Sequence, residues 1–243
     1  QAPRGDFTPS AGARALEFLS YGVCAAGLVG LGFPVIANAN NIAYRREAFD
    51  AAGGFAGHSD LSGDDDFILQ DIHATGRWSI RYCTHPESRV FTTPPETWAH
   101  FWEQRKRWAG KCVYYRAPQL AFLLFIFLFY ATIAVLLIAG LFGVGDGHLG
   151  KLGLLGLGLK AGAELLVMRE GLSLFNQFSL IRYFPFTALI HIPLILAATV
   201  CGVLGQSTWK GQKLRARRRG KPSTPEHAPE HEPAGPTRTK PDA

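Results

Sequence analysis

The chain has 243 residues and a formal net charge of +6, and 47% of its residues are hydrophobic. The apolar residues are too unevenly distributed for a single soluble globule: residues 1–118 mix charge with short apolar runs, residues 119–209 are mostly hydrocarbon, and residues 210–243 contain almost nothing that could pack. The positive charge does not indicate a nucleic-acid partner, because much of it directly follows the last apolar run, in Lys210, Lys213, Arg215, Arg217, Arg218, Arg219 and Lys221.

Clustered lysine and arginine after an apolar segment are typical of a membrane anchor whose basic end faces the cytosol. We therefore predict a lipid bilayer as a partner, and no nucleic acid. The four cysteines lie far apart and form neither a CxxC pair nor a zinc-ligand pattern, so we expect reduced, structural thiols. Because the sequence opens at Gln1 with no signal sequence, we expect an upstream segment to be missing.

The first part of the chain predicts an entry loop and a helix. Residues 1–12 are rich in Pro, Gly and Ser and predict a loop, and residues 14–21 predict a helix. Residues 22–36 are apolar, but they form a short run that three glycines and Pro34 interrupt. We therefore expect a buried loop and strand there rather than a membrane span.

Short helices and strands are expected to follow. Residues 38–44 indicate a strand or loop, and residues 46–52 a helix that two glycines end. Residues 64–75 predict a helix that opens with three carboxylates, which favour a helix N-terminus electrostatically. Residues 78–83 and 89–93 predict short strands, and an aromatic, basic helix is expected to begin after them, near Pro94.

Apolar segments dominate the second region. Residues 120–144 carry no charge and suffice to cross a hydrocarbon core of about 30 Å at about 1.5 Å per residue. Residues 184–205 are also uncharged. Residues 149–168 are a weaker candidate because charge interrupts them, although Lys160 and Glu164 are four residues apart and could pair on one helical face. We predict two to three apolar membrane segments.

The basic tail, residues 210–243, is expected to be disordered. If the catalytic part and this tail both face the cytosol, the number of crossings must be even. We therefore expect residues 149–168 to be re-entrant or interfacial. Trp209, Lys210 and Gly211 are expected to anchor the chain at the membrane surface, and His85 and His191 are assigned structural roles because neither has an apparent ligand partner.

Three local patterns occur in order before the first long apolar segment. They are Asn41-Ile42-Ala43-Tyr44-Arg45-Arg46 with Gly53-Gly54-Phe55, then Ser62-Gly63-Asp64-Asp65-Asp66, then Gln104-Arg105-Lys106-Arg107-Trp108. Together they resemble the membrane-bound family 2 glycosyltransferases that build polysaccharides or glycolipids, over roughly residues 15–215. The third pattern matches that family's QxxRW motif, and the second its acidic base motif.

The resemblance implies an α/β fold: the acceptor-side half of a GT-A nucleotide-sugar transferase domain in residues 1–118, then an α-helical transmembrane region in residues 119–209. It implies inverting transfer from a nucleotide sugar donor to a polysaccharide or lipid acceptor, in a multi-pass protein of the inner membrane whose catalytic part faces the cytoplasm. The family usually uses Mg²⁺ or Mn²⁺, and its DxD metal ligands belong upstream of this chain. The alternatives are a non-catalytic scaffold or degenerate partner that lacks the donor-binding half, and a transporter, which would not explain the acidic and QxxRW patterns.

The acidic run suits a general base. A carboxylate that accepts the proton of the attacking hydroxyl contributes on the order of a hundredfold to ten-thousandfold in rate. Three adjacent aspartates repel one another, so at least one pKa should rise. The family pattern assigns the base to Asp65 and an acidic neighbour to Asp64, and leaves Asp66 open. Without the resemblance, the run reads as an acidic helix start or a divalent-cation loop.

The QxxRW residues lie at i, i+3 and i+4 and are expected to share one face of a helix. Arg107 can stabilise a diphosphate leaving group, Gln104 can position a substrate, and Trp108 offers a flat face to a sugar or base. An interfacial helix with an aromatic belt is an alternative reading. The resemblance also implicates Asn41 in substrate binding, although Ala39 stands where the family often has glycine.

Overall fold

The computed structural model describes residues 2–3, 8–55, 63–92, 95–145, 147–209 and 212–215. Most of the regular structure in them is α-helical. The α-helices are α1 (Pro9–Gly30), α2 (Arg46–Ala51), α3 (Asp64–Ala74), α4 (Trp98–Lys111), α5 (Ala117–Leu141), α6 (His148–Leu174) and α7 (Phe184–Leu204). Short 3-10 helices are η1 (Ala39–Asn41), η2 (Pro86–Ser88), η3 (Cys112–Tyr114) and η4 (Phe178–Tyr183).

The strands form only two small pairs within the described residues. The two-residue strand β1 (Ala2–Pro3) pairs in parallel with β2 (Phe91–Thr92), and β3 (Gln206–Trp209) pairs antiparallel with β4 (Gln212–Arg215). The predicted α/β fold, with half of a GT-A domain, is therefore wrong for the part of the chain that the structure describes.

Helical periodicity explains most of this error. The apolar run after residue 21 continues the helix α1 to Gly30 instead of forming a loop and strand. Leu16, Leu19 and Val23 recur on one face of α1 and pack with Met168 and Leu172 of α6 in one buried cluster. That burial outweighs the cost of glycine in a helix, which is about 1 kcal/mol per residue.

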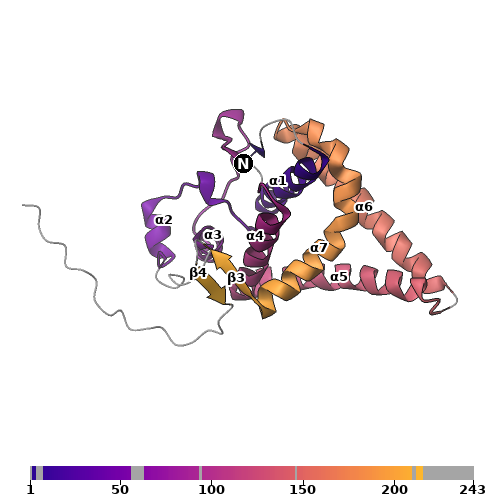
Figure 1. Ribbon diagram of the computed structural model, residues 1–243. Coiled ribbons are helices and arrows are strands. Elements are labelled where there is room, and N and C mark those ends of the chain that lie inside the picture. The colour runs from indigo at the N-terminus through magenta and orange to yellow at the C-terminus, as the bar shows by residue number, and fades with distance from the viewer. Residues whose placement is uncertain are drawn as a thin grey trace, which may run out of the picture.

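Figure 1 shows α5 and α6 as a long hairpin on the right, with α2 and α3 on the left and α1 and α4 between them. Helix α7 runs from the α6 end of the hairpin back towards α4. A methyl group on Gly110 of α4 would lie 2.6 Å from the backbone oxygen of Gly202 in α7, so the two helices cross with their backbones in contact. Helix α7 thus connects the α5–α6 hairpin with α4.

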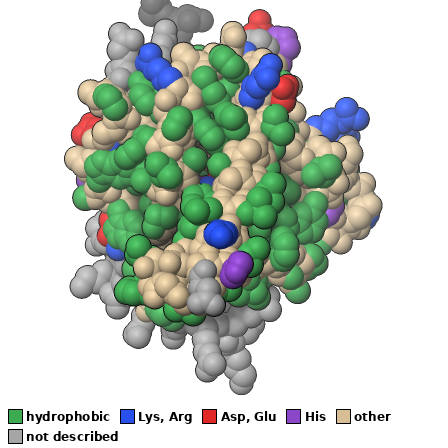
Figure 2. Space-filling view, turned by 90° about the vertical axis from the view of Figure 1, so that its right-hand side faces the viewer, with side chains coloured by type: hydrophobic (Ala, Val, Ile, Leu, Met, Phe, Trp, Pro, Cys, Tyr) green, Lys and Arg blue, Asp and Glu red, His purple; other side chains and the backbone are tan. Residues whose placement is uncertain are grey.

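Two segments are long and apolar enough to cross a membrane by length and composition: Ala117–Leu141, with mean hydropathy 2.8, and Phe178–Leu204, with 2.1. Figure 2 shows the hairpin side of the molecule as a mostly hydrophobic face with few charged side chains. Exposed large apolar side chains of α5 include Phe125, Leu128 and Val135. Membrane association is therefore indicated by these two helices.

Helix α6 corrects one expectation about the weaker apolar segment. It is a single helix of 27 residues, extends six residues beyond the predicted end, and packs along α5. A re-entrant segment would turn back within the membrane, and α6 contains no such break. The interfacial alternative stays a prediction.

The predicted loop and tail are each shorter than expected. Helix α1 already begins at Pro9, with the Thr8 hydroxyl accepting from the amide of Ala11. Residues 212–215 of the predicted disordered tail form β4. The remainder of the tail, together with Lys210 and Gly211 of the predicted anchor, lies outside the described residues.

Candidate functional site

The acidic run opens helix α3, as predicted. Gly63 precedes it with φ 117°, a left-handed conformation that a side chain would strain, and all three aspartates lie in the first turn. Asp64 is exposed, Asp65 is partly buried and Asp66 is fully buried. One helical turn therefore places three identical side chains in three different environments.

Asp66 is held from three directions. Its Oδ1 accepts from the amide of Ala37 at 2.7 Å, and its Oδ2 accepts from the Tyr115 hydroxyl and pairs with the Lys111 ammonium. Burial raises the pKa of Asp66, Lys111 opposes that rise, and Asp65 adds to it. Burial also raises the pKa of Tyr115, which keeps its hydroxyl a proton donor. Asp66 thus serves as a buried anchor for its neighbours.

Asp65 has a more open environment. Its Oδ2 accepts from the amide of Ala39 at 3.0 Å, and its Oδ1 accepts from the amide of Asp66 at 3.0 Å and lies 3.8 Å from the Lys111 ammonium. Ala39 acts through its backbone and has no positive φ, so glycine is not required at this position. Two amides therefore fix the carboxylate while 18% of the side chain stays accessible.

Helix α4 carries the QxxRW residues and begins where the Thr97 hydroxyl accepts from the amide of His100. Its two buried side chains are Phe101 and Arg105, and Arg105 is an intervening residue of the motif. Arg105 donates through Nε to Glu17 of α1 at 2.6 Å and makes a second contact through Nη2. Aromatic rings surround the guanidinium, and Trp108 is the nearest, with its centroid at 4.3 Å. Arg105 and Glu17 therefore hold α4 against α1.

The QxxRW side chains diverge from there. Gln104 accepts from Arg105 Nη1 at 2.9 Å, and the Trp108 ring packs edge-on against Tyr21 of α1 at 4.8 Å. Arg107 instead lies near Asp65: burial lowers the pKa of Arg107, and the charge of Asp65 opposes that shift. Arg107 therefore lies within electrostatic reach of the acidic site, Gln104 bonds to Arg105 on its own helix, and Trp108 packs against α1.

The first pattern forms a separate support. Asn41 donates through its side-chain nitrogen to the Ser88 backbone oxygen at 2.6 Å, which ties η1 to η2. Tyr44 stacks on Phe49, and Phe55 packs edge-on against the same ring. These contacts position the segment that supplies the amides of Ala37 and Ala39. Asn41 therefore supports the site indirectly, by holding this segment in place.

A family model described as Glycosyl transferase family group 2 matches residues 12–201, which is more than half of the chain. The chain belongs to this family. Comparison with curated proteins and with solved structures gave no match. Membership in this family makes glycosyl transfer the reaction class to consider for the acidic turn and Arg107.

The family pattern did not identify four side chains that build this site: Glu17, Arg105, Lys111 and Tyr115. Each pairs with a residue distant in sequence, such as Arg105 with Glu17 across 88 positions. The one local signal was the aromatic and basic composition of α4, which predicted a helix but not these contacts.

Family 2 glycosyltransferases often use Mg²⁺ or Mn²⁺, but the described side chains do not fit such an ion. They contain no group of three or more His, Cys, Asp or Glu side chains that could hold a metal. The carboxylates of Asp65 and Asp66 face amide, hydroxyl and ammonium donors, whereas a divalent cation needs oxygen ligands with free lone pairs.

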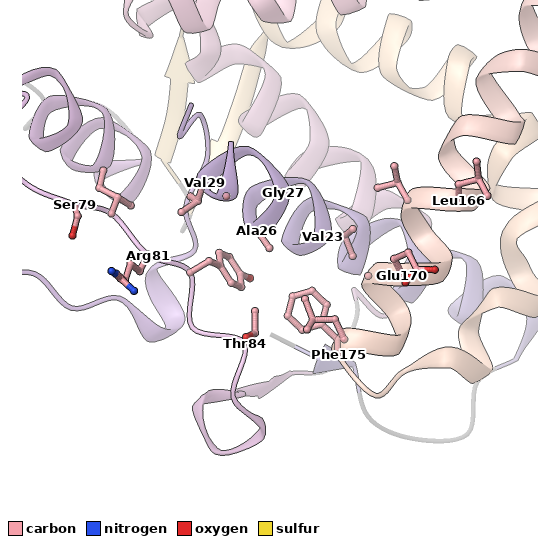
Figure 3. Close-up of a pocket in the computed structure, with 16 residues that line it drawn as sticks. Val23, Ala26, Gly27, Val29, Ser79, Arg81, Thr84, Leu166, Glu170 and Phe175 are labelled. Atoms are coloured by element: carbon pink, nitrogen blue, oxygen red, sulfur yellow. The ribbon is translucent and has the colours of Figure 1, made fainter. Parts of the chain in front are cut away.

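A groove of about 1050 Å³ lies on the other side of α1, between that helix, the extended segment 79–84 and the end of α6. Figure 3 shows Val23, Ala26 and Gly27 of α1 facing Leu166 and Phe175 across it. Its lining is mostly apolar. Leu28, next to the lining residue Val29, packs against the cluster of Phe67 and Tyr115. The end of α1 therefore separates this groove from the acidic site.

The glycosyltransferase chain also has a second polar cluster, among α5, α6 and α7. Glu164 pairs with Lys160 at 2.7 Å and accepts from the Tyr130 hydroxyl at 2.9 Å, and His191 lies 3.1 Å from the same carboxylate. Lys160 and Glu164 pair on one face of α6, as predicted. His191 contributes a contact between helices, which agrees with its predicted structural role.

Proposed function

We propose that this chain is part of a longer family 2 glycosyltransferase that moves a sugar from a nucleotide sugar to a membrane-associated acceptor, with inversion at the transferred carbon. Asp65 is the general base, and Arg107 stabilises the leaving group. The observation that supports this proposal is an accessible carboxylate on α3, held by two backbone amides, with a guanidinium of α4 close enough to feel its charge.

The reaction is a single displacement. The acceptor oxygen bonds to the sugar carbon as the bond to the nucleoside diphosphate breaks, and the hydroxyl proton passes to Asp65. The diphosphate leaves with the bonding electrons, and Arg107 offers it charge-assisted hydrogen bonds. Asp64 contributes negative charge beside the base, and Gln104, Trp108 and Asn41 help to position the substrates by holding in place the helix and the loop segment that carry the site.

A lipid-linked acceptor suits the structure better than a free polysaccharide. Leu152, Leu155, Leu159 and Leu166 form one exposed stripe along α6, and Leu166 lines the groove beside α1. An apolar chain that follows this stripe from the bilayer enters the groove, one helix away from the acidic site. This arrangement requires insertion in the inner membrane through α5 and α7, with the catalytic part on the cytoplasmic side, where nucleotide sugars are made.

The test is Asp65→Asn in the full-length protein, with transfer from radiolabelled nucleotide sugars to isolated membranes as the readout. We expect transfer to fall at least about a hundredfold, while binding of the nucleotide sugar is retained. Adding lipid-linked and free oligosaccharide acceptors to the wild type separates the two acceptor classes. Activity within about threefold of wild type, equivalent to less than about 1 kcal/mol, would refute Asp65 as the base. If the full-length wild-type protein binds no nucleotide sugar, the chain would instead be part of a non-catalytic partner.

A further inference from the structure

The groove beside α1 has a charged residue at each end. Figure 3 shows Arg81 at the end near Val29, and Glu170 at the opposite end near Leu166. Both residues are exposed, and among the described residues no side-chain hydrogen bond or ion pair engages either of them. The groove therefore offers an unpaired positive charge at one end and an unpaired negative charge at the other.

Two glycines of α1 leave open space in the groove. Helix α1 touches α6 where Val23 packs on Gly171, because a methyl group on Gly171 would lie 2.4 Å from the Val23 side chain. Further along α1, Gly27 and Gly30 line the groove, and a methyl group on either would meet nothing within 4 Å. Neither has a positive φ, so neither conformation nor packing requires glycine there. The open space fits a third use of glycine, the close approach of a ligand to the backbone.

The space between the two charges suits a hydrocarbon chain. Its volume of about 1050 Å³ is at the upper end of the range of ligand pockets, which is about 300–1,000 Å³. A hydrocarbon chain needs no hydrogen-bond partners in a mostly apolar lining, whereas an extended peptide would bury N–H and C=O groups without partners. The leucine stripe of α6 reaches the groove at Leu166, which gives such a chain a path from the bilayer.

The charges at the two ends give the ligand a direction. The guanidinium of Arg81 can bind a phosphate with two parallel hydrogen bonds, whereas the carboxylate of Glu170 repels one. Arg89, another arginine nearby, donates to the backbone oxygen of Phe175 at 2.8 Å and does not line the groove. An anionic head group is therefore favoured at the Arg81 end, and the apolar chain at the α6 end.

We propose that the acceptor is an anionic lipid whose phosphate binds Arg81 and whose chain lies over Gly27 and Gly30. This inference rests on the proposed function and narrows the acceptor from lipids in general to lipids that carry a phosphate. Leu28, at the same end of α1 as Arg81, packs against the cluster of Phe67 and Tyr115 behind the acidic turn. The group carried on the phosphate thus lies at the end of the groove nearest to the acidic site.

The experiment measures binding of two photoreactive probes, hexadecyl phosphate and hexadecanol, to the full-length protein in a neutral detergent. Each probe carries a diazirine at the end of its chain, and mass spectrometry locates the crosslinks. We expect the phosphate probe to label α1 and the end of α6, and to bind about ten- to a hundredfold more tightly than the alcohol, the effect of charged hydrogen bonds.

One variant at each part of the groove tests the two contacts separately. Arg81→Gln should weaken the phosphate probe by about ten- to a hundredfold and leave the alcohol unchanged. Arg77→Gln is its matched control, because Arg77 is exposed on the same segment but does not line the groove; both probes should bind it as they bind the wild type.

Gly27→Leu fills the groove and should weaken both probes at least about tenfold. Its unfolding temperature should not fall, because leucine is a better helix former than glycine and meets open space there. Gly158→Leu, on an exposed part of α6 outside the groove, is the control and should bind both probes normally.

Three outcomes would overturn the proposal. Equal binding of the phosphate probe by Arg81→Gln and the wild type removes the head-group contact, and equal binding by Gly27→Leu removes the chain site. Complete displacement by an excess of inorganic phosphate, with no binding of the alcohol, would show a site for free phosphate instead of a lipid. Asp65→Asn separates the two levels: if it remains active, the proposed function fails, whereas an inactive Asp65→Asn with unchanged probe binding by Arg81→Gln refutes only the anionic lipid.

Discussion

The acidic turn and the polar cluster of the apolar helices are both built from a lysine, a tyrosine and a carboxylate, but only the acidic turn has a second carboxylate. Lys111, Asp66 and Tyr115 form one set, and Lys160, Glu164 and Tyr130 form the other. In both sets a lysine and a tyrosine hydroxyl hold one carboxylate. The first set lies beside a second carboxylate, Asp65, whereas the second lies beside the ring of His191.

The difference teaches how to tell a reactive cluster from a structural one. In the apolar helices a single carboxylate faces the lysine, the tyrosine and the histidine, so its oxygens are shared among donors from three helices. At the acidic turn two carboxylates face one lysine: Asp66 contacts the Lys111 ammonium directly, and Asp65 lies 3.8 Å from it as a second acceptor. A surplus acceptor is what a general base requires, and a fully shared one is what a joint between helices requires.

The largest effect is expected from breaking the joint between the apolar helices. Lys160→Met leaves Glu164 without its cation and should cost about 3–5 kcal/mol in the free energy of unfolding. Combining it with Glu164→Gln should restore most of that loss. Lys151→Met, on an exposed part of the same helix, should stay within about 0.5 kcal/mol of wild type. Denaturant unfolding in detergent micelles measures all three, and equal losses for Lys160→Met and Lys151→Met would remove the structural role.

The second prediction separates two arginines of one motif. Arg107→Lys should lower kcat/KM about ten- to a hundredfold, the effect of losing about 1.5–3 kcal/mol of charged hydrogen bonding, because an ammonium cannot make the two-pronged contact. Its stability should not change. Arg105→Lys should do the reverse and lose about 2 kcal/mol of stability or more, since the bidentate pair with Glu17 and the ring contacts disappear.

Purified full-length variants, with initial rates and thermal unfolding measured on the same samples, test this separation. If Arg107→Lys keeps the wild-type rate, the QxxRW helix acts only as a support. If Arg105→Lys lowers the rate without lowering stability, the roles of the two arginines are reversed.

Local signals in the sequence located several elements well. The helix at Asp64 begins where predicted because three carboxylates and a preceding glycine mark its first turn. Helix α7 begins at Phe184, as predicted, because the uncharged run has a sharp start. In each case the information lies within a few residues of the element.

Long-range pairings explain what the sequence could not show. The glycines of residues 22–30 suggested a break, but α1 stays helical because α6, about 150 positions away, buries the face of α1 that carries Leu19 and Val23. The distinct roles of Asp65 and Asp66 depend on Lys111, Tyr115 and two backbone amides, and nothing near the aspartates encodes them. The contacts that distinguish Asp65 from Asp66 therefore come from tertiary packing and not from the local sequence.

The smallest effect is expected where α7 connects the two regions. Gly202 is buried against α4, and a methyl group there would overlap the Lys106 backbone oxygen and lie 2.9 Å from the Gly110 amide nitrogen. Glycine to alanine in the middle of a helix normally stabilises by about 0.5–1 kcal/mol. Gly202→Ala should instead destabilise by about 1–2 kcal/mol, because rigid backbone cannot move aside. Gly158→Ala, which meets open space in α6, provides the matched control and should stabilise. Unfolding of both variants in the same detergent decides the point: a stabilised Gly202→Ala would mean that α4 and α7 do not cross in contact, and that the reactive cluster and the structural one are independent.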